Sequence, residues 1–177
     1  MKYELPFWCN TRAETVTKEK MDLLYKMNCG RLNIGLSISI FEPSFLKFVL
    51  AYHRAGKLPP GGLIKFYFAS DELPFGMPPS IASLEAYLGM LGDCDLPWLV
   101  SSFGDDCVRC GIAEEAIIRG GHVQVGLEPY AGPRQPSNAE LVEEVVALAT
   151  QFERPIATPA QAAAILELPT YPVPFAA

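Results

Sequence analysis

Positive charge is scarce in this chain of 177 residues. It has 14 lysines and arginines against 20 aspartates and glutamates, which gives a formal net charge of −6 and a pI of about 4.9. No run of basic side chains is available to neutralise phosphates, and that interaction dominates nucleic-acid binding. We therefore expect no nucleic-acid partner.

Long apolar runs are absent as well. A membrane-spanning helix needs about 20 consecutive apolar residues, and no stretch of the sequence reaches that length. The first residues, MKYELPFWCN, lack the apolar core of a signal peptide. Half of all residues are nevertheless hydrophobic, which is enough to build a core. These features predict a single globular domain over residues 1–177, in the cytoplasm and without membrane contact.

Cysteine and histidine, the usual ligands of zinc, are few. The five cysteines are irregularly spaced, at Cys9, Cys29, Cys94, Cys107 and Cys110. Cys107 and Cys110 form a lone C-x-x-C, which could be a redox pair or half of a zinc site. A second C-x-x-C is missing, and His53 and His122 lie far away in the sequence. We favour buried apolar side chains for these cysteines.

Strand-like and helix-like segments alternate along the chain. Apolar, β-branched segments predict five strands, at 7–16, 31–40, 63–70, 97–103 and 122–128. Helical spacing predicts helices at 17–30, 43–57, 81–92, 105–121, 139–152 and 160–168. This order is typical of an α/β fold with a parallel sheet and crossover helices. Residues 169–177 form a Pro-rich tail, for which we expect a loose or surface-docked segment.

Several helix boundaries carry their own signals. Thr17 and Ser80 can cap helices, while Ser137 with Glu140, and Thr158 with Gln161, form capping boxes. The helix from Pro43 is expected to stop at Gly56. Its apolar side chains share one face, the face expected to pack on the core: Phe45, Phe48, Val49 and Tyr52.

The segment GGHVQVGLE, residues 120–128, ends in a lone glutamate. Alternation along a strand puts Val123, Val125 and Leu127 on one face, and His122, Gln124, Gly126 and Glu128 on the other. In a barrel the second face looks inward, and sites lie at the carboxyl ends of the strands. Glu128 is therefore a candidate metal ligand or base, with a solvated glutamate as the equal alternative. His122, at the opposite end, is interpreted as a structural histidine.

Several segments resemble the β-keto acid cleavage enzyme family, of which the 3-keto-5-aminohexanoate cleavage enzyme is typical. They lie between residues 41 and 168 and include FEPSFLKFVLAYHRAGKLPPGGLIKFYF, PWLVSSFG, GGHVQVGLE and GPRQPSNAELVEEVVALA. The resemblance implies an incomplete TIM-type barrel, because five strands are too few to close eight. It also implies a divalent metal, usually zinc, and acetyl-CoA, which the family uses to cleave a β-keto acid into acetoacetate and a new CoA ester. Glu128 matches the family's glutamate ligand.

The sequence departs from that family at several positions. The family's strand usually reads G-H-V-R-V-G-L-E-D, so its arginine is Gln124 here and its aspartate is Pro129. Gln124 lacks the charge and five-donor fork of arginine, and Pro129 supplies neither an acid nor an N–H. The family's His-x-His ligand motif is missing, and one carboxylate is too few ligands for a tightly held zinc. We therefore predict weak or absent metal binding and turnover near background.

Residues 5–39 resemble a different family. LPFWCNTRAETVTKEKMDLLYKMNCGRLNIGLSIS is similar to an internal piece of radical SAM enzymes, but the C-x-x-x-C-x-x-C triplet of their iron–sulfur cluster is missing. We expect no cluster. We interpret the chain as a join near residues 38–42 between a radical SAM-like piece, 1–39, and a β-keto acid cleavage enzyme-like half, 41–168. A recombined or engineered chimera is the favoured origin, and a truncated gene product or a divergent homologue with a misread front are the alternatives.

Two function classes follow from these patterns. The chain is either an altered β-keto acid cleavage enzyme, which would need another subunit to complete its metal sphere, or a catalytically inert β/α scaffold, truncated or chimeric. Because the inward face of an open sheet would stay exposed unless covered, we also predict a homodimer.

Overall fold

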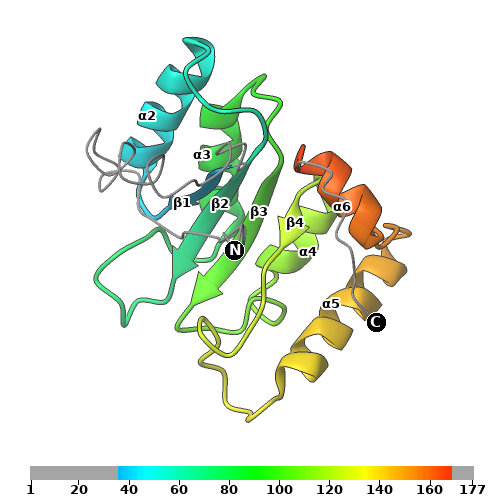
Figure 1. The fold of residues 1–177 in the computed structure, drawn as a ribbon. Helices are drawn as coiled ribbons and strands as arrows, with labels where there is room; N and C mark the ends of the chain where they lie inside the picture. The colour runs from blue at the N-terminus through cyan, green and yellow to red at the C-terminus, as the bar shows by residue number, and fades with distance from the viewer. Residues whose placement is uncertain (1–35, 169–177) are drawn as a thin grey trace, which may run out of the picture.

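The structure is a computed structural model that describes residues 36–168. Strands and helices alternate over most of this range (Figure 1). The strands are β1 (Leu36–Ile40), β2 (Gly62–Ala69), β3 (Trp98–Phe103) and β4 (His122–Val123). The helices are α2 (Pro43–Arg54), α3 (Ile81–Leu91), α4 (Ile112–Ile118), α5 (Asn138–Gln151) and α6 (Pro159–Ile165).

The four strands form one parallel sheet in the order β1-β2-β3-β4. Each strand pairs with the next one along the chain, with Ile40 opposite Phe66, Phe66 opposite Val100, and Val100 opposite Val123. This is the strand order of a β/α barrel wall, and β1 and β4 are its free edges among the described residues. The predicted α/β fold with an open, partial barrel is confirmed. The first predicted strand and helix, 7–30, lie outside the described residues, as does the tail 169–177.

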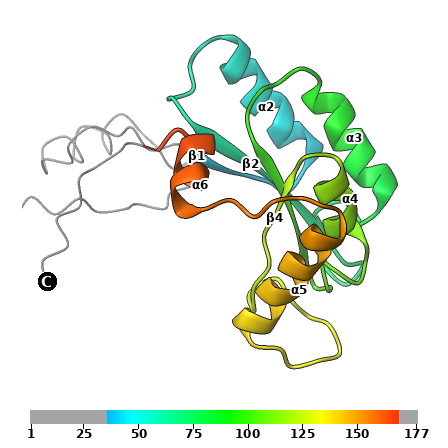
Figure 2. The ribbon, with the colours of Figure 1, turned by 90° about the vertical axis from the view of Figure 1, so that its right-hand side faces the viewer.

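One face of the sheet is covered by helices. Helices α2, α3 and α4 lie on the same side of the strands (Figures 1 and 2). Phe66 of β2 stacks on Tyr87 of α3 with ring centroids 4.7 Å apart, and both side chains are fully buried. Burying an aromatic side chain of this size stabilises the fold by about 2–3 kcal/mol, so this layer is the core.

The apolar face predicted for α2 is not its buried face. Leu46 and Leu50 pack into the core, whereas Phe45, Phe48 and Tyr52 are exposed, Phe48 by 69%. The reason is the position of β1 at the edge of the described sheet: no further helix within residues 36–168 packs against the outer side of α2. The predicted ends at Pro43 and Gly56 are confirmed.

Helix α4 begins later than predicted, at Ile112. Asp106 accepts hydrogen bonds from the backbone N–H groups of Val108 and Arg109, at 3.1 and 3.2 Å, which holds residues 106–109 in a turn. Gly111 then adopts a left-handed φ of 85°, a conformation that an α-helix cannot contain.

The helix caps follow the sequence. Ser80 accepts a hydrogen bond from the backbone of Ser83, and both predicted capping boxes, Ser137 with Glu140 and Thr158 with Gln161, are present. No helix among residues 36–168 combines the length and apolar character needed to cross a membrane.

Candidate functional site

A row of polar side chains crosses the sheet on the face opposite the helices. Tyr67 of β2 pairs in register with Ser101 of β3. Gln124 follows directly after Val123, the partner of Val100, and therefore lies opposite Ser101. The Tyr67 hydroxyl donates to Gln124 Oε1 over 3.4 Å. The buried hydroxyl of Ser101 has no hydrogen-bond partner among the described residues. In a β/α barrel this face would be the interior.

The positively charged side chain of Lys65 lies beside this row. Lys65 precedes Tyr67 by two residues and so shares its face, with Nζ 5.2 Å from the centre of the Tyr67 ring. Opposite Lys65 in register is Leu99, which in turn pairs with His122. Burial, and secondarily the charge of Arg154, lower the pKa of His122. The sheet face thus offers one fixed cation and several neutral polar groups.

Aromatic rings close the carboxyl end of the same face. The Tyr67 ring lies 4.9 Å from that of Phe41 and 5.0 Å from that of Phe103, and Phe75 packs edge-on against Phe41 at 5.4 Å. Aromatic walls exclude water and strengthen the polar interactions beside them. The sequence analysis did not predict Lys65, Tyr67 or the aromatic rings as site residues. The alternation in LIKFYF could have shown that Lys65 and Tyr67 share one face.

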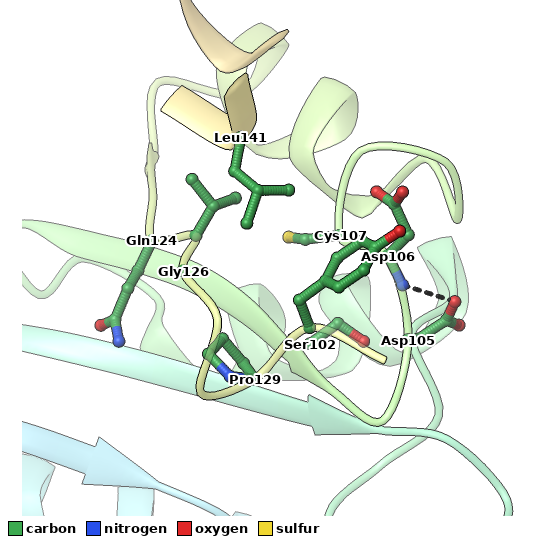
Figure 3. A pocket seen from close by; sticks show the side chains of 10 residues that line it. Ser102, Asp105, Asp106, Cys107, Gln124, Gly126, Pro129 and Leu141 are labelled. Atoms are coloured by element: carbon green, nitrogen blue, oxygen red, sulfur yellow. Dashed lines mark hydrogen bonds between the residues drawn. The ribbon is translucent and has the colours of Figure 1, made fainter. Parts of the chain in front are cut away.

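A small cavity lies on the other side of β3 and of the segment after β4. Its walls include Ser102, Asp105, Cys107, Tyr130 and Leu141 (Figure 3). In Figure 3 the Gln124 side chain extends away from this cavity, on the side opposite Leu141 and Cys107. The cavity measures about 10 Å³, which is room for about one water molecule. It cannot hold a substrate, so the polar row is the better candidate site.

The loop after β4 is fixed by Arg134. Its guanidinium contacts Glu144 of α5 through both terminal nitrogens and reaches Asp106 over 3.1 Å. The hydrogen bonds to Glu144, and then to Asp106, raise the pKa of Arg134 above its ordinary range. Such a planar, bidentate contact orders a loop more than a lysine could.

The predicted position of Glu128 on a strand is wrong. Strand β4 ends at Val123, and residues 127–129 form a turn in which Leu127 and Glu128 are exposed. The turn forms because Asn138 accepts a hydrogen bond from Leu127 N, and Pro129 O accepts one from Gly104 N, at 3.0 Å each. The predicted alternation, with Leu127 on the face of Val123 and Glu128 on the face of Gln124, therefore does not hold beyond the end of β4.

The surroundings of Glu128 do not fit a catalytic zinc. Among residues 36–168, the only three side chains that lie together as metal ligands are His53, Cys94 and Asp95, far from this turn. Both histidines of the chain fall within this range, and neither joins Glu128. Catalytic zinc takes three protein ligands, and within residues 36–168 no other ligand joins Glu128. The role predicted for Glu128 stays a prediction.

Cys107 and Cys110 remain free thiols. Burial is the main cause that raises the pKa of both, and each thiol is further disfavoured as an anion by nearby Asp105 and Asp106. Cys110 donates its S–H to the carbonyl of Cys107 over 3.5 Å. Metal binding and thiol exchange both need the thiolate, so the environment supports the interpretation as apolar side chains.

Comparison with known sequences identifies the family. Residues 7–168 match the β-keto acid cleavage enzyme family over most of the chain. The chain belongs to this family. The match also takes in most of residues 5–39, the segment that resembles radical SAM enzymes, and a join near 38–42 stays a prediction.

Three curated relatives are similar to parts of this β-keto acid cleavage enzyme chain. The 3-oxoadipate:acetyl-CoA acetyltransferase of Cupriavidus necator is 32% identical over 139 residues, which are 75% of this chain and 47% of that protein. The 3-keto-5-aminohexanoate cleavage enzymes of Acetoanaerobium sticklandii and Fusobacterium nucleatum are 52% and 44% identical over 59 and 75 residues. Those segments are 31% and 40% of this chain, and 22% and 27% of the relatives. The chain therefore spans about half, or less, of the relatives it matches.

Proposed function

We propose that this chain forms part of the wall of a β-keto acid cleavage site. The reaction is the transfer of an acyl group: the bond between the β-carbonyl and the α-carbon of the keto acid breaks, and the acyl group passes to CoA. The acetyl group of acetyl-CoA takes its place on the α-carbon, so the products are a new CoA ester and acetoacetate. Membership in the family supports this class of reaction.

The main observation behind this proposal is the hydrogen bond between Tyr67 and Gln124. Gln124 stands where the family has arginine, at the carboxyl end of β4 on the face that would look into a barrel. Since its Oε1 accepts the Tyr67 hydrogen bond, its NH₂ group is left to donate to a substrate carboxylate. Lys65, on the same face, supplies the positive charge that Gln124 lacks. We infer that these two residues bind the carboxylate of the keto acid.

We propose that turnover by this chain alone is near background. Pro129 occupies the position of the family's aspartate, and its buried ring offers no acid or base. When bound, a zinc ion would polarise the substrate carbonyl, but Glu128 is the one family ligand that this chain carries. The imidazoles would have to come from outside residues 1–177, and we propose that a further subunit supplies them.

Binding and turnover can be tested separately with 3-oxoadipate, the compound named in the Cupriavidus necator relative. We expect 3-oxoadipate to bind, with binding weakened at least about tenfold in Gln124→Ala and in Lys65→Ala, which corresponds to the loss of one hydrogen bond to a charged group. Lys57→Ala is the matched control, since Lys57 is exposed on the loop before β2. Equal affinity in all three variants would contradict the proposed carboxylate site.

The second candidate is an inert β/α scaffold. Two observations favour it: Pro129 replaces the family's aspartate, and no other metal ligand lies beside Glu128 within residues 36–168. It predicts no saturable binding of 3-oxoadipate at any concentration. In the turnover test, acetoacetate formed from acetyl-CoA and 3-oxoadipate is measured with and without added zinc. Zinc-dependent turnover that is lost in Glu128→Ala would overturn both the scaffold and the near-background proposal.

A further inference from the structure

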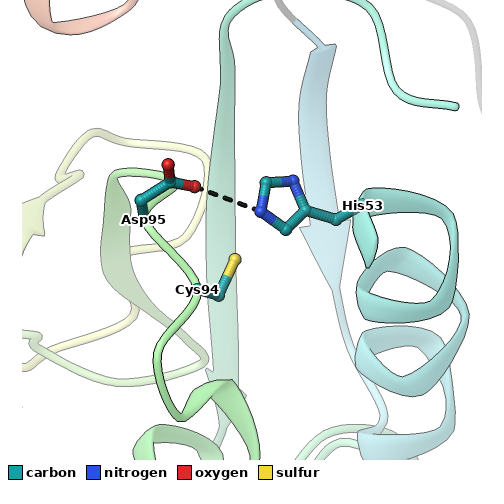
Figure 4. A group of neighbouring side chains, drawn as sticks. All are labelled: His53, Cys94 and Asp95. Carbon is teal, nitrogen blue, oxygen red and sulfur yellow. Dashed lines mark ion pairs between the residues drawn. The ribbon is translucent and has the colours of Figure 1, made fainter. Parts of the chain in front are cut away.

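Three metal-ligating side chains meet near the amino end of β3, whereas the turn that contains Glu128 follows the carboxyl end of β4. His53 lies in the last turn of α2, and Cys94 and Asp95 lie in the loop between α3 and β3 (Figure 4). Their ligand atoms all lie within 4.8 Å of one another, and His53 Nε2 is 3.1 Å from Asp95 Oδ1. In Figure 4 the Cys94 sulfur points toward the space between the imidazole and the carboxylate.

The cluster rests on a rigid support. Leu50 of α2 and Leu91 of α3 are buried next to it, 4% and 5% exposed, and helices α2 and α3 pack against each other. Gly92 ends α3 with a left-handed φ of 59°, and Cys94 N then donates to Leu91 O over 3.2 Å. The turn formed in this way directs Cys94 back toward the end of α2. The three ligands are therefore brought together by tertiary packing and not by a local sequence motif.

The donor set is one that zinc prefers. Imidazole nitrogen, thiolate sulfur and carboxylate oxygen bind zinc at about 2.0–2.3 Å, so the ligand atoms of a tetrahedral site lie about 3.3–3.8 Å apart. The distances in the cluster, from 3.1 Å up to at most 4.8 Å, bracket this range. A hard cation such as magnesium or calcium would take oxygen ligands instead of sulfur.

A fourth position is available beside the cluster. His53 and Cys94 line a cavity of about 180 Å³ that also includes Asp93, which is room for several water molecules. A water molecule can therefore complete a four-coordinate sphere. An ordinary ion pair between His53 and Asp95 would explain two of the side chains, but it gives no reason for the position of the thiol.

We propose that His53, Cys94 and Asp95 bind a zinc ion that ties the end of α2 to the loop between α3 and β3. Binding replaces the Cys94 S–H bond by an S–Zn bond and releases the proton to solvent. The site is separate from Glu128, which follows β4 at the other end of the sheet. Its effect is on stability, because zinc that binds only the folded chain shifts unfolding to higher temperature.

Cobalt(II) in place of zinc gives the test a direct signal. Titrating the full chain with cobalt should produce the thiolate-to-metal charge-transfer absorption at one equivalent, and zinc should displace the cobalt and raise Tm. Cys94→Ser should abolish the absorption. The Asp95 side chain is 85% exposed, so Asp95→Asn should not unfold the chain. This variant should keep the absorption and weaken metal binding more than about tenfold. Even the loss of a group that only orients a ligand costs 10–100-fold.

Two variants serve as matched controls. Cys110→Ser removes another partly buried thiol, and Glu128→Gln removes the family's ligand; both should leave the absorption and the affinity unchanged. No charge-transfer absorption in the unmodified chain would overturn the proposal. An absorption that survives in Cys94→Ser would do the same, because it would place the thiolate elsewhere. An affinity unchanged in Asp95→Asn would remove Asp95 from the site.

Discussion

Arg134 binds the buried carboxylate of Asp106 across 28 residues of sequence, with 3.1 Å between Nη2 and Oδ2. Asp106 lies in the turn after β3, and Arg134 lies in the loop between β4 and α5. The Arg134 guanidinium also contacts Glu144 of α5. One cation therefore joins three chain segments at the carboxyl end of the sheet, and it holds the loop that contains Glu128 and Pro129.

Loss of the Asp106 carboxylate should destabilise the fold markedly. Asp106 is only 2% exposed and accepts hydrogen bonds from two backbone N–H groups and from Arg134. We expect Asp106→Ala to lower the free energy of unfolding by about 2 kcal/mol, because it removes three hydrogen bonds from part-buried donors to a buried carboxylate. Urea denaturation measures this change. Glu143→Ala, at an exposed helix position, is the control and should stay within about 0.5 kcal/mol; equal effects of both variants would refute the role of Asp106.

Stability should depend on pH through His122. Its folded-state pKa lies below the ordinary value of 6.5, mainly because of burial, so the unfolded chain takes up a proton at higher pH than the folded chain. The stabilising contribution is present above pH 6.5 and is lost as the pH falls below that value. Thermal melts between about pH 7 and pH 5 should show a falling Tm. This fall should be smaller in His122→Gln, and parallel curves for the two proteins would count against the prediction.

Glu128 should matter little to folding. Its side chain is exposed in a turn that is held by backbone and Asn138 contacts. We expect Glu128→Ala to change the free energy of unfolding by no more than about 0.5 kcal/mol, as for most exposed substitutions. Asn138→Ala provides the contrast, since it removes the acceptor of Leu127 N and should cost about 1 kcal/mol. A larger loss in Glu128→Ala than in Asn138→Ala would show a structural role for the carboxylate.

Self-association remains a prediction that light scattering can check. The structure adds a second reason for it: besides the open sheet face, Phe45, Phe48 and Tyr52 form an exposed aromatic stripe on α2. We expect a dimer at micromolar concentration. Phe48→Ser should leave the fold intact, because this side chain is mostly exposed, and it should weaken association if the stripe contributes. A clean monomer for the unsubstituted chain would contradict the prediction.

The sequence by itself determined the local features of this protein. The caps at Ser80, Ser137 and Thr158 depend on side chains within three residues of the helix start, so their spacing alone predicts them. The parallel β/α order follows from alternating periodicities in the same way. The family could be identified from the segments around Gln124 and Glu128, because these residues are close together in sequence.

Only the tertiary structure decided which groups meet and which faces are buried. Helix α2 has apolar side chains on two faces, and packing on the sheet buries Leu46 and Leu50 while Phe45, Phe48 and Tyr52 stay exposed. Strand β4 ends at Val123, and the turn at residues 127–129 depends on Asn138 of α5, which accepts a hydrogen bond from Leu127 N. His53, Cys94 and Asp95 come from two segments about 40 residues apart, and no spacing rule links them. Their meeting depends on the packing of α2 against α3, since long-range contacts follow from the burial of apolar surface and not from the order of residues along the chain.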